Sequence, residues 1–203
     1  MKVRVGATPE RHVWSLPVPR YRTINTRLGP FFFVVDDLGR IARAGFVDAE
    51  PETLHGATED AALMPELADE LVRYFNGEAA DFSFVPTPNG PPFFHACWEA
   101  CRRIPAGSTA SYRDVAESAG RTNASRAAGQ AMRNNRLPVI IPCHRVVTTG
   151  GGAGGFGGKT GRDHPAIRRK LALQDLDRLQ TAQAALPPHH GRGPTNEHAT
   201  LTV

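Results

Sequence analysis

The chain has 203 residues, of which 40% are hydrophobic and 22% charged, and its formal net charge at pH 7 is +4. This composition is typical of a globular protein with one large domain or two small ones. No run of about 18 apolar residues occurs and no apolar stretch follows the first charges, so we predict neither a membrane span nor a secretory signal and expect a cytoplasmic protein, or a nuclear one in a eukaryote. Three cysteines are too few for a disulfide framework, which fits a reducing compartment with a free thiol.

The charge is unevenly distributed along the chain. Residues 1–100 carry 9 Lys and Arg against 14 Asp and Glu, a net of −5; residues 101–170 carry 13 against 3, a net of +10; residues 171–203 carry 2 against 3, a net of −1. A basic segment in an otherwise acidic chain favours binding to a polyanion, above all nucleic acid. A solvated basic surface without a ligand is the alternative.

The first half predicts a small α/β domain over residues 21–86, preceded by a proline-interrupted N-terminal extension, 1–20. Residues 23–28, 31–35 and 40–47 have strand-forming patterns, the last two on either side of the turn Asp36-Asp37-Leu38-Gly39, which indicates a hairpin or small antiparallel sheet. Apolar residues then recur at helical spacing and stop at Gly77, so we predict an amphipathic helix over 60–76 that packs on the sheet.

A proline-rich stretch that cannot sustain a helix or strand marks a linker at 87–92, and a mainly helical domain follows over 93–179. Its first helix places Cys97 and Cys101 four residues apart on one face, where they could suggest a metal pair with His95. Four ligands at recognisable spacings are lacking and buried free cysteines are common, so we predict no metal site.

Two short helices come next. Ser111, with Asp114 three residues later, caps the first, which Gly120 ends; the second spans 124–133. Helices joined by a glycine-containing turn predict a helix-turn-helix, which is a weak signal alone but lies here within the +10 segment.

The second of these helices is made largely of small residues, namely Ala124, Ser125, Ala127, Ala128, Gly129 and Ala131. Glycine inside a helix costs about 1 kcal/mol relative to alanine, so we infer that another helix or a groove of nucleic acid approaches closely. Tight helix packing explains the small residues but not Arg126 and Arg133, which lie seven positions apart.

Cys143 lies between the apolar run 137–141, which predicts a buried extended segment, and the glycine-rich loop 150–158. A nucleophilic cysteine acts as its thiolate and needs a nearby cation or base; His144 and Arg145 follow it directly. Neighbours in an extended chain point to opposite sides, so His144 would need a bridging water or a turn to reach the sulfur. No motif for hydrolysing a captured group is present.

A last helix is predicted over 166–179, with Ile167, Leu171, Leu173 or Gln174, and Leu176 on or near a common face. Residues 180–203 are rich in Pro, His, Gly, Thr and Gln, and we expect them to be disordered. His189 and His190 in this tail could suggest a metal site, but we do not predict one there.

The run Ile141-Pro142-Cys143-His144-Arg145-Val146-Val147, followed by Gly154-Gly155-Phe156-Gly157-Gly158, resembles the active-site signature of the O6-alkylguanine-DNA alkyltransferases, or methylated-DNA–protein-cysteine methyltransferases. Residues 126–133 resemble that family's recognition helix. The resemblance is strong over 93–176, looser over 21–82 and absent from both ends. It implies an α+β protein, with a ribonuclease-H-like N-terminal domain and a helical DNA-binding domain. It further implies a monomer without a cofactor that acts on double-stranded DNA carrying O6-alkylguanine. The resemblance does not decide whether O4-alkylthymine is also a substrate.

The resemblance also implies a catalytic set. Cys143 would take the alkyl group irreversibly as a thioether, once per molecule, from a nucleotide flipped out of the duplex. Tyr112 would donate to guanine N3, although an aromatic at a helix start is its alternative reading. His144 would link the thiol, through water, to an acid on the last helix. The best alignment, which needs about three inserted residues within 159–165, places that acid at Asp175, with Asp177 as a substitute; the family usually has Glu there.

The DNA-binding residues implied are Ser125, Arg126, Ala127, Gly129, Arg133 and Arg145, with Arg126 filling the vacated base stack. The substrate pocket implied consists of Met132, Asn135, Pro138, Val146, Phe156 and Gly157. Within it, Asn135 would brace the turn before the cysteine, while the carbonyls of Cys143 and Val146 and the amide of Gly157 would read the base. The family usually has Asn-Pro where this chain has Asn135-Arg136, which should loosen the turn and adds a cation beside the DNA.

Two other readings stay open at this stage. An alkyltransferase-like protein recognises the lesion without transfer, but such proteins lack cysteine at the nucleophile position and Cys143 is present. A helix-turn-helix transcription regulator would need a sensor or dimerisation domain, and the small N-terminal domain offers no obvious one.

Overall fold

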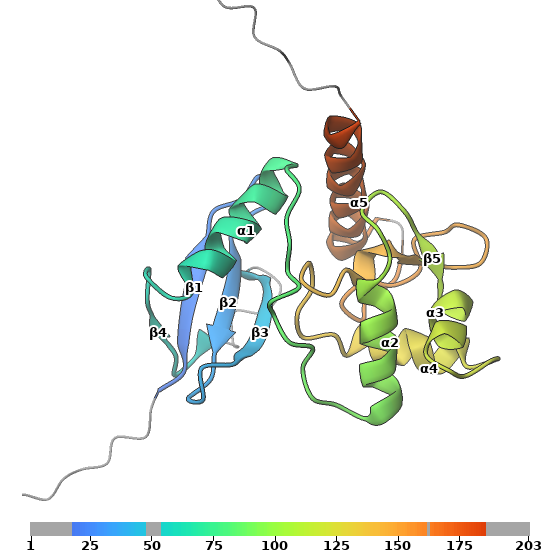
Figure 1. Ribbon diagram of the computed structural model, residues 1–203, viewed down its shortest axis with the longest axis horizontal. Helices are drawn as coiled ribbons and strands as arrows, with labels where there is room; N and C mark the ends of the chain where they lie inside the picture. Colours follow the sequence, from blue (N-terminus) through green and yellow to red (C-terminus); the bar gives the residue numbers. More distant parts are fainter. Residues whose placement is uncertain (1–17, 48–53, 162, 186–203) are drawn as a thin grey trace, which may run out of the picture.

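A computed structural model describes residues 18–47, 54–161 and 163–185, and most of the predicted extension 1–20 lies outside these ranges. Figure 1 shows two groups of elements, a sheet with one helix and a bundle of helices. The sheet contains β1 (Arg20–Ile24), β2 (Phe31–Val35), β3 (Ile41–Phe46) and β4 (Thr58–Glu59) in the order β3-β2-β1-β4. β2 pairs antiparallel with β1 and β3, and β4 pairs parallel with β1. The predicted antiparallel sheet is confirmed.

The hairpin turn is held by Asp36, whose Oδ1 accepts the amides of Leu38 and Arg40 at 3.0 and 2.9 Å. Helix α1 (Pro65–Asn76) covers the sheet, and the ring of Phe31 lies 5.2 Å from that of Phe75 on this helix. The helix begins at residue 65 rather than 60 because Asp60 caps a turn ahead of it, its Oδ1 accepting the Ala62 amide at 2.9 Å, and proline at the first helical position suits a helix start.

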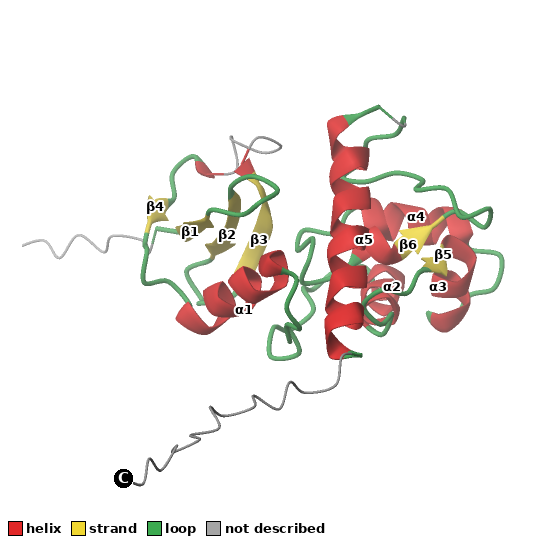
Figure 2. Cartoon of the chain, turned by 90° about the horizontal axis from the view of Figure 1, so that it is seen from above, coloured by secondary structure: helices red, strands yellow, loops and turns green. Residues whose placement is uncertain are grey.

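The second group contains α2 (Pro92–Arg102), α3 (Tyr112–Ser118), α4 (Ser125–Arg133) and α5 (Pro165–Ala184), with a small parallel pair formed by β5 (Ala110–Ser111) and β6 (Val146–Val147). Figure 2 shows α5 running alongside the other helices of this group. Ser111 and Asp114 form the predicted capping box at the start of α3, with bonds of 3.1 and 2.8 Å.

Two expectations about local structure are wrong. Four of the five residues 137–141 are buried as predicted, all but Pro138, but the segment forms a turn and is not extended: the Ile141 amide donates to the Leu137 carbonyl at 2.8 Å and Val139 has a φ of +76°. α5 continues to residue 184 instead of 179 because Gln180 still faces the interior, so the first residues of the expected disordered tail are helical. Residues 186–203 lie outside the described ranges.

The two groups share one apolar core. The Ala44 amide of β3 donates to the carbonyl of Arg136 at 2.8 Å, and the guanidinium of Arg169 lies 4.1 Å from the ring centre of Phe46. Among the described helices, none combines the length and apolar character that a membrane crossing requires.

Cys97 and Cys101 lie within this core on α2. Burial raises the pKa of the Cys97 thiol to about 11 and that of Cys101 well above its usual value. The described residues contain no cluster of three or more His, Cys, Asp or Glu side chains suited to a metal ion, and both thiols pack as small apolar groups.

Candidate active site

Cys143 opens a single 3-10 turn, Cys143–Arg145, between Pro142 and β6. The Cys143 amide donates to the Ile141 carbonyl at 2.7 Å and the Arg145 amide to the Pro142 carbonyl at 2.8 Å. The chain is therefore turned here, and not extended. The turn directs His144, which is 0% exposed, into the interior, whereas Cys143 remains 7% exposed in the wall of a cavity.

The segment that leads to this turn is braced by Asn135. Its Nδ2 donates to the Ile141 carbonyl at 2.9 Å, and its Oδ1 accepts the Leu137 amide at 2.9 Å. Arg136, which stands where a proline was expected, keeps its carbonyl on the Ala44 amide. The turn before the cysteine is thus tied both to itself and to β3.

His144 meets a carboxylate and a phenol. Its Nε2 lies 3.0 Å from Oδ2 of Asp177 and 3.2 Å from Oη of Tyr74, and Tyr74 Oη donates to Oδ1 of Asp177 at 3.2 Å. Arg145 donates to both oxygens of the same carboxylate, at 2.7 and 3.0 Å. Burial and the Asp177 charge raise the pKa of Tyr74 well above its usual value, so the phenol stays protonated.

The protonation of this cluster is set by its contacts. Burial alone would raise the pKa of Asp177, but hydrogen bonds from His144 and Arg145 outweigh it and the pKa is lowered. Burial lowers the pKa of His144, so the imidazole is neutral at pH 7. Because an ionised carboxylate only accepts, the ring proton belongs on Nε2. Nδ1 then carries the lone pair, and this buried atom has no hydrogen-bond partner among the described residues. It can accept a proton.

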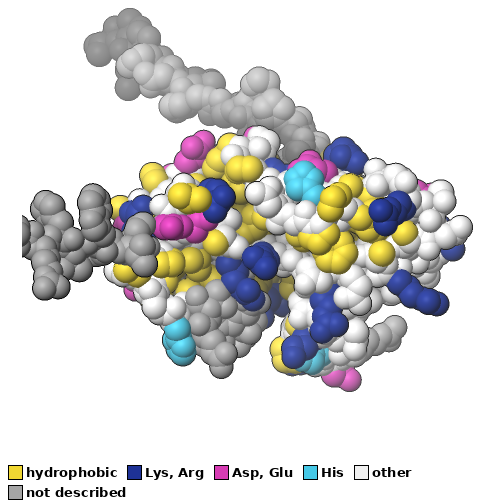
Figure 3. Space-filling view, turned by 90° about the horizontal axis from the view of Figure 1, so that it is seen from below, with side chains coloured by type: hydrophobic (Ala, Val, Ile, Leu, Met, Phe, Trp, Pro, Cys, Tyr) yellow, Lys and Arg dark blue, Asp and Glu magenta, His cyan; other side chains and the backbone are white. Residues whose placement is uncertain are grey.

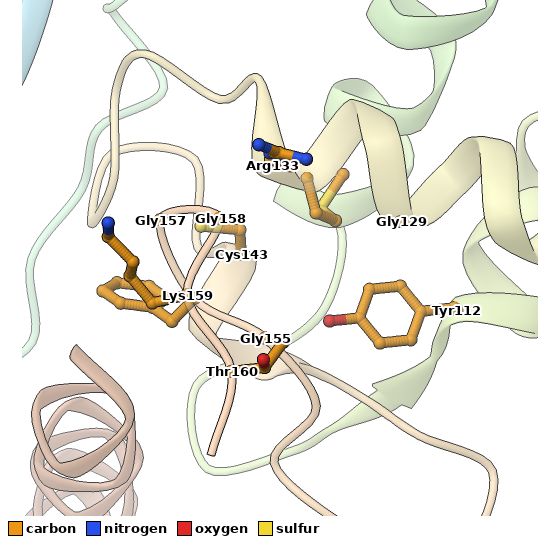
Figure 4. Close-up of a pocket in the computed structure, with 11 residues that line it drawn as sticks. Tyr112, Gly129, Arg133, Cys143, Gly155, Gly157, Gly158, Lys159 and Thr160 are labelled. Carbon is orange, nitrogen blue, oxygen red and sulfur yellow. The ribbon is translucent and has the colours of Figure 1, made fainter. Parts of the chain in front are cut away.

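The cavity beside Cys143 is the size of a small aromatic ligand, about 270 Å³. Figure 4 shows the Tyr112 hydroxyl directed into it from one side and Cys143 in its wall, with the glycine-rich loop opposite. Burial raises the pKa of Tyr112, opposed by a hydrogen bond from the Gly155 amide. Tyr112 is therefore a protonated donor at neutral pH.

A larger cavity of about 580 Å³ adjoins the first and also contains Cys143 in its wall. It runs between the end of α4, strand β3 and the start of α5. Its lining includes five basic residues, Arg43, Arg133, Arg136, Lys159 and Arg169. Figure 3 shows Lys and Arg side chains on both sides of a hollow in one face of the molecule.

α4 presents two different sides. Ala128, Ala131 and Met132 are buried, and the Ala131 carbonyl accepts the Trp98 indole at 2.8 Å. Arg126 is exposed. A Cβ added at Gly129 would lie 3.9 Å from Tyr112 Cδ1, an ordinary contact, so packing within the protein does not require glycine at this position.

Residues 20–88 match the family model described as 6-O-methylguanine DNA methyltransferase, ribonuclease-like domain, and residues 92–177 match the one described as 6-O-methylguanine DNA methyltransferase, DNA binding domain. The chain is 34% identical over 143 residues to the constitutive methylated-DNA–protein-cysteine methyltransferase of Bacillus subtilis, spanning 68% of this chain and 86% of that protein. The corresponding methyltransferase of Mycobacterium bovis is 33% identical over 163 residues, spanning 78% and 92%. The chain belongs to the 6-O-methylguanine DNA methyltransferase family.

Solved structures agree with this methyltransferase assignment. The structure of Mycobacterium tuberculosis OGT in complex with DNA has a TM-score of 0.68 and 30% identity to this chain, and covers 79% of this chain and 94% of its own. The M. tuberculosis O6-methylguanine methyltransferase structure has a TM-score of 0.67 at 30% identity, with coverages of 84% and 96%.

The acid expected from the methyltransferase resemblance was placed on the wrong residue. Asp175 is exposed and pairs with Arg178 at 2.5 Å, whereas Asp177 is buried against His144. Two positions correspond to about 200° around a helix, so the two carboxylates lie on opposite sides of α5. Leu173 and Gln174 are buried and lie four and three residues before Asp177. This helical spacing is the sequence signal that indicates Asp177, and not Asp175, as the inward-facing acid.

Arg145 was predicted to bind DNA, and the structure gives its guanidinium an internal role. Besides the contacts with Asp177, its Nη1 donates to the Ile104 carbonyl at 2.7 Å, and its side chain is only 13% exposed. The positive charge of Arg145 is therefore paired with Asp177 inside the protein and is not available to bind DNA.

Other expected residues lie around the two cavities. Met132, Phe156 and Gly157 line both, and Asn135 and Pro138 line the larger one. Val146 is buried and is not among the residues that line these two cavities; its carbonyl accepts a hydrogen bond from Nζ of Lys170 at 2.5 Å. Sequence reasoning assigned no role in the site to Tyr74, Lys170 or Gln174. The amide of Gln174 donates to the His144 carbonyl at 2.7 Å. Tyr74 carried only the signal of a helix packing residue.

Proposed function

We propose that this protein repairs DNA by moving a methyl or larger alkyl group from O6 of guanine to Cys143, directly and irreversibly. The observation that carries the proposal is the Cys143 thiol in the wall of a base-sized cavity, next to a neutral histidine held by an ionised carboxylate. Family membership supports the same reaction. An alkyl thioether resists hydrolysis, and the sequence contains no motif for hydrolysing a captured group, so each molecule acts once.

The transfer begins with the thiol proton. Burial raises the pKa of Cys143, partly offset by the Asn135 amide and the Lys170 charge, so the free thiol is protonated and needs a base. A water molecule carries its proton to Nδ1 of His144, and Asp177 stabilises the imidazolium. The sulfur attacks the alkyl carbon; an S–C bond forms, the C–O6 bond breaks, and its electron pair stays on guanine.

Tyr112 stabilises guanine as the leaving group. As negative charge spreads from O6 to N3, the protonated phenol donates to N3. The proton that left the thiol returns to guanine, so guanine is restored and the cysteine remains as a thioether. The balance requires no metal, reductant or other co-reactant.

α4 delivers the nucleotide. Its small residues allow the helix to enter the minor groove, and the glycine that internal packing does not require, Gly129, lies where a base would pass. Flipping the nucleotide costs a few kcal/mol, and the exposed Arg126 fills the gap in the stack. Ser125, Ala127 and Arg133 form the rest of this DNA surface.

The partner is double-stranded DNA that contains O6-alkylguanine. We expect one chain to act alone, without a cofactor, in the compartment that holds the DNA: the cytoplasm, or the nucleus of a eukaryote. The basic stretch 101–170, with a net charge of +10, favours this partner over a small-molecule substrate.

Intact-protein mass spectrometry tests the proposal. After mixing with a duplex that contains O6-methylguanine, the wild type should gain the mass of one methyl group, mapped to Cys143, at a ratio of one per chain. Cys143→Ala should gain none and still bind the duplex. An unchanged wild-type mass with intact duplex binding would instead support the lesion-recognition function without transfer.

A further inference from the structure

Lys170 is a buried charged residue at the site that the reaction above leaves without a role. Its side chain is 0% exposed. Nζ donates to the carbonyls of Val146 at 2.5 Å, Ala153 at 2.5 Å and Gly155 at 3.2 Å. An ammonium has three N–H donors, and three carbonyls take them all.

These three carbonyls belong to the two segments that flank the cavity, the one that follows the cysteine turn and the glycine-rich loop. Val146 begins β6, directly after the turn that contains Cys143. Ala153 and Gly155 belong to the glycine-rich loop, and Gly155 lines the cavity together with Cys143. Nζ also lies 6.0 Å from the ring centre of Tyr112. One ammonium thus connects the cysteine turn, the loop and the tyrosine behind the space for the base.

The partners of Lys170 are neutral, so its charge is not cancelled. Within the described ranges, no carboxylate forms an ion pair with it. Burying an unpaired charge is costly, and neutral side chains that pack well would avoid this cost. The site retains a net positive charge where a neutral anchor would have sufficed for packing.

The other basic residues near Cys143 do not provide such a buried charge. Arg133 and Lys159 line the cavity but are exposed, so water and salt screen their charges. His144 is neutral at pH 7 because burial lowers its pKa, and the guanidinium of Arg145 is paired with both oxygens of Asp177. Burial lowers the pKa of Lys170 to about 8, which leaves it protonated at pH 7. The thiolate and the guanine anion both form in the cavity that is lined by Gly155, whose carbonyl Lys170 binds from behind.

We propose that Lys170 is a positioning residue for alkyl transfer: it ties the Val146 carbonyl after the cysteine turn to the Gly155 carbonyl of the cavity wall, and it supplies a buried, uncompensated positive charge that stabilises the Cys143 thiolate and the departing guanine anion. The inference rests on the proposed transfer to Cys143. Without this charge, the proton leaves the thiol at higher pH and the base departs more slowly.

The test compares Lys170→Gln and Lys170→Met with Arg168→Gln, which removes an exposed charge from the same helix. Free O6-benzylguanine serves as substrate, so that DNA binding does not contribute. At pH 7 we expect both Lys170 variants to transfer the benzyl group at least tenfold more slowly and Arg168→Gln to match the wild type. The rate of Cys143 alkylation by iodoacetamide, mapped by peptide mass, should shift to higher pH by about one unit in the Lys170 variants.

A merely structural anchor gives a different result. Loss of the loop contacts alone would slow transfer by the same factor at every pH and leave the Cys143 alkylation profile in place, which would overturn the proposal. Should the variants not fold by circular dichroism, the wild type decides: its transfer rate should decline above pH about 8, where Lys170 loses its proton, and a rate that climbs to pH 10 refutes the role.

Failure of the proposed function remains distinguishable. A wild type that accepts no benzyl group contradicts alkyl transfer itself. The iodoacetamide profile does not depend on that reaction and still measures the effect of Lys170 on the thiol. Wild-type transfer with unchanged Lys170 variants contradicts only the inference about Lys170.

Discussion

Asp177 accepts hydrogen bonds from side chains of two separate segments: Tyr74 on α1, and His144 and Arg145 on the cysteine turn. One buried carboxylate therefore fixes the tautomer of the histidine, cancels the charge of the arginine and attaches α5 to α1. A carboxylate with this many donors is ionised, and its replacement leaves Arg145 as a buried charge without a counterion.

Asp177→Asn tests this role against its neighbour on the helix. Asparagine has the same shape but cannot balance Arg145, so we expect the free energy of unfolding to fall by about 3–5 kcal/mol and alkyl transfer to slow. Asp175→Asn, which breaks an exposed pair with Arg178, should change stability by less than about 0.5 kcal/mol. Urea unfolding of both variants is the measurement. Equal losses would contradict the placement of the acid.

At the scale of elements, α4 combines a buried side and an exposed arginine on one nine-residue helix. Ala128 and Ala131 pack inside, which accounts for part of its small-residue composition without DNA. Gly129 and Arg126 are not explained by that packing. The helix thus has an internal reason for its alanines and an external one for its glycine and arginine.

Arg126→Ala should separate base flipping from chemistry. If Arg126 fills the stack, the variant loses a share of the few kcal/mol that flipping costs, and repair of methylated duplex should slow roughly 10- to 100-fold. Transfer from free O6-benzylguanine should be unchanged, since no base is flipped. Arg178→Ala, on another helix, serves as the control and should behave as wild type on both substrates. Equal losses of Arg126→Ala on duplex and free base would show that this arginine acts elsewhere.

Local sequence signals predicted elements well and tertiary contacts poorly. The Asp36 turn, the Ser111–Asp114 capping box and the stop at Gly77 each depend on residues a few positions apart, and each is present. Asp177 was ranked second because inserted residues between 159 and 165 blurred the alignment before the last helix.

Lys170 illustrates the limit of such reasoning. In the sequence it looks like any helical lysine, because the three carbonyls that surround it come from residues 15 to 24 positions away. Cys143 stood out by contrast because its whole signature is contiguous. Chemistry carried by a short motif is readable from sequence, whereas the groups that support it from a distant helix are not.

At the scale of the whole molecule, the sheet and α1 contact the candidate active site as well as forming part of the core. Tyr74 reaches from α1 to His144 and Asp177, and β3 is bonded to the turn that precedes Cys143 through the Arg136 carbonyl. The N-terminal half thereby contacts the same nitrogen of His144 as Asp177 on α5.

Tyr74→Phe tests this connection and retains the packing of the ring. Loss of the hydroxyl should lower the free energy of unfolding by about 1 kcal/mol and slow alkyl transfer, because the imidazole and the carboxylate lose a shared partner. Tyr21→Phe is the matched control, since its hydroxyl makes no hydrogen bond with any residue that the structure describes. Urea unfolding and single-turnover transfer measure the two effects. A Tyr74→Phe variant as stable and as fast as Tyr21→Phe would show that the halves are merely adjacent.

α5 constrains where this chain tolerates a change in length. Lys170, Gln174 and Asp177 are spaced by four and three residues, so they share one helical face beneath the cysteine turn. One residue inserted between Lys170 and Asp177 would rotate the C-terminal part of the helix by about 100° and remove Asp177 from His144 while Lys170 stayed in place. An insertion before His164, where α5 is capped, would lengthen a loop and leave the three residues in phase. The helix thus fixes the relative positions of Lys170, Gln174 and Asp177, and the chain tolerates a change in length only in the loop ahead of α5.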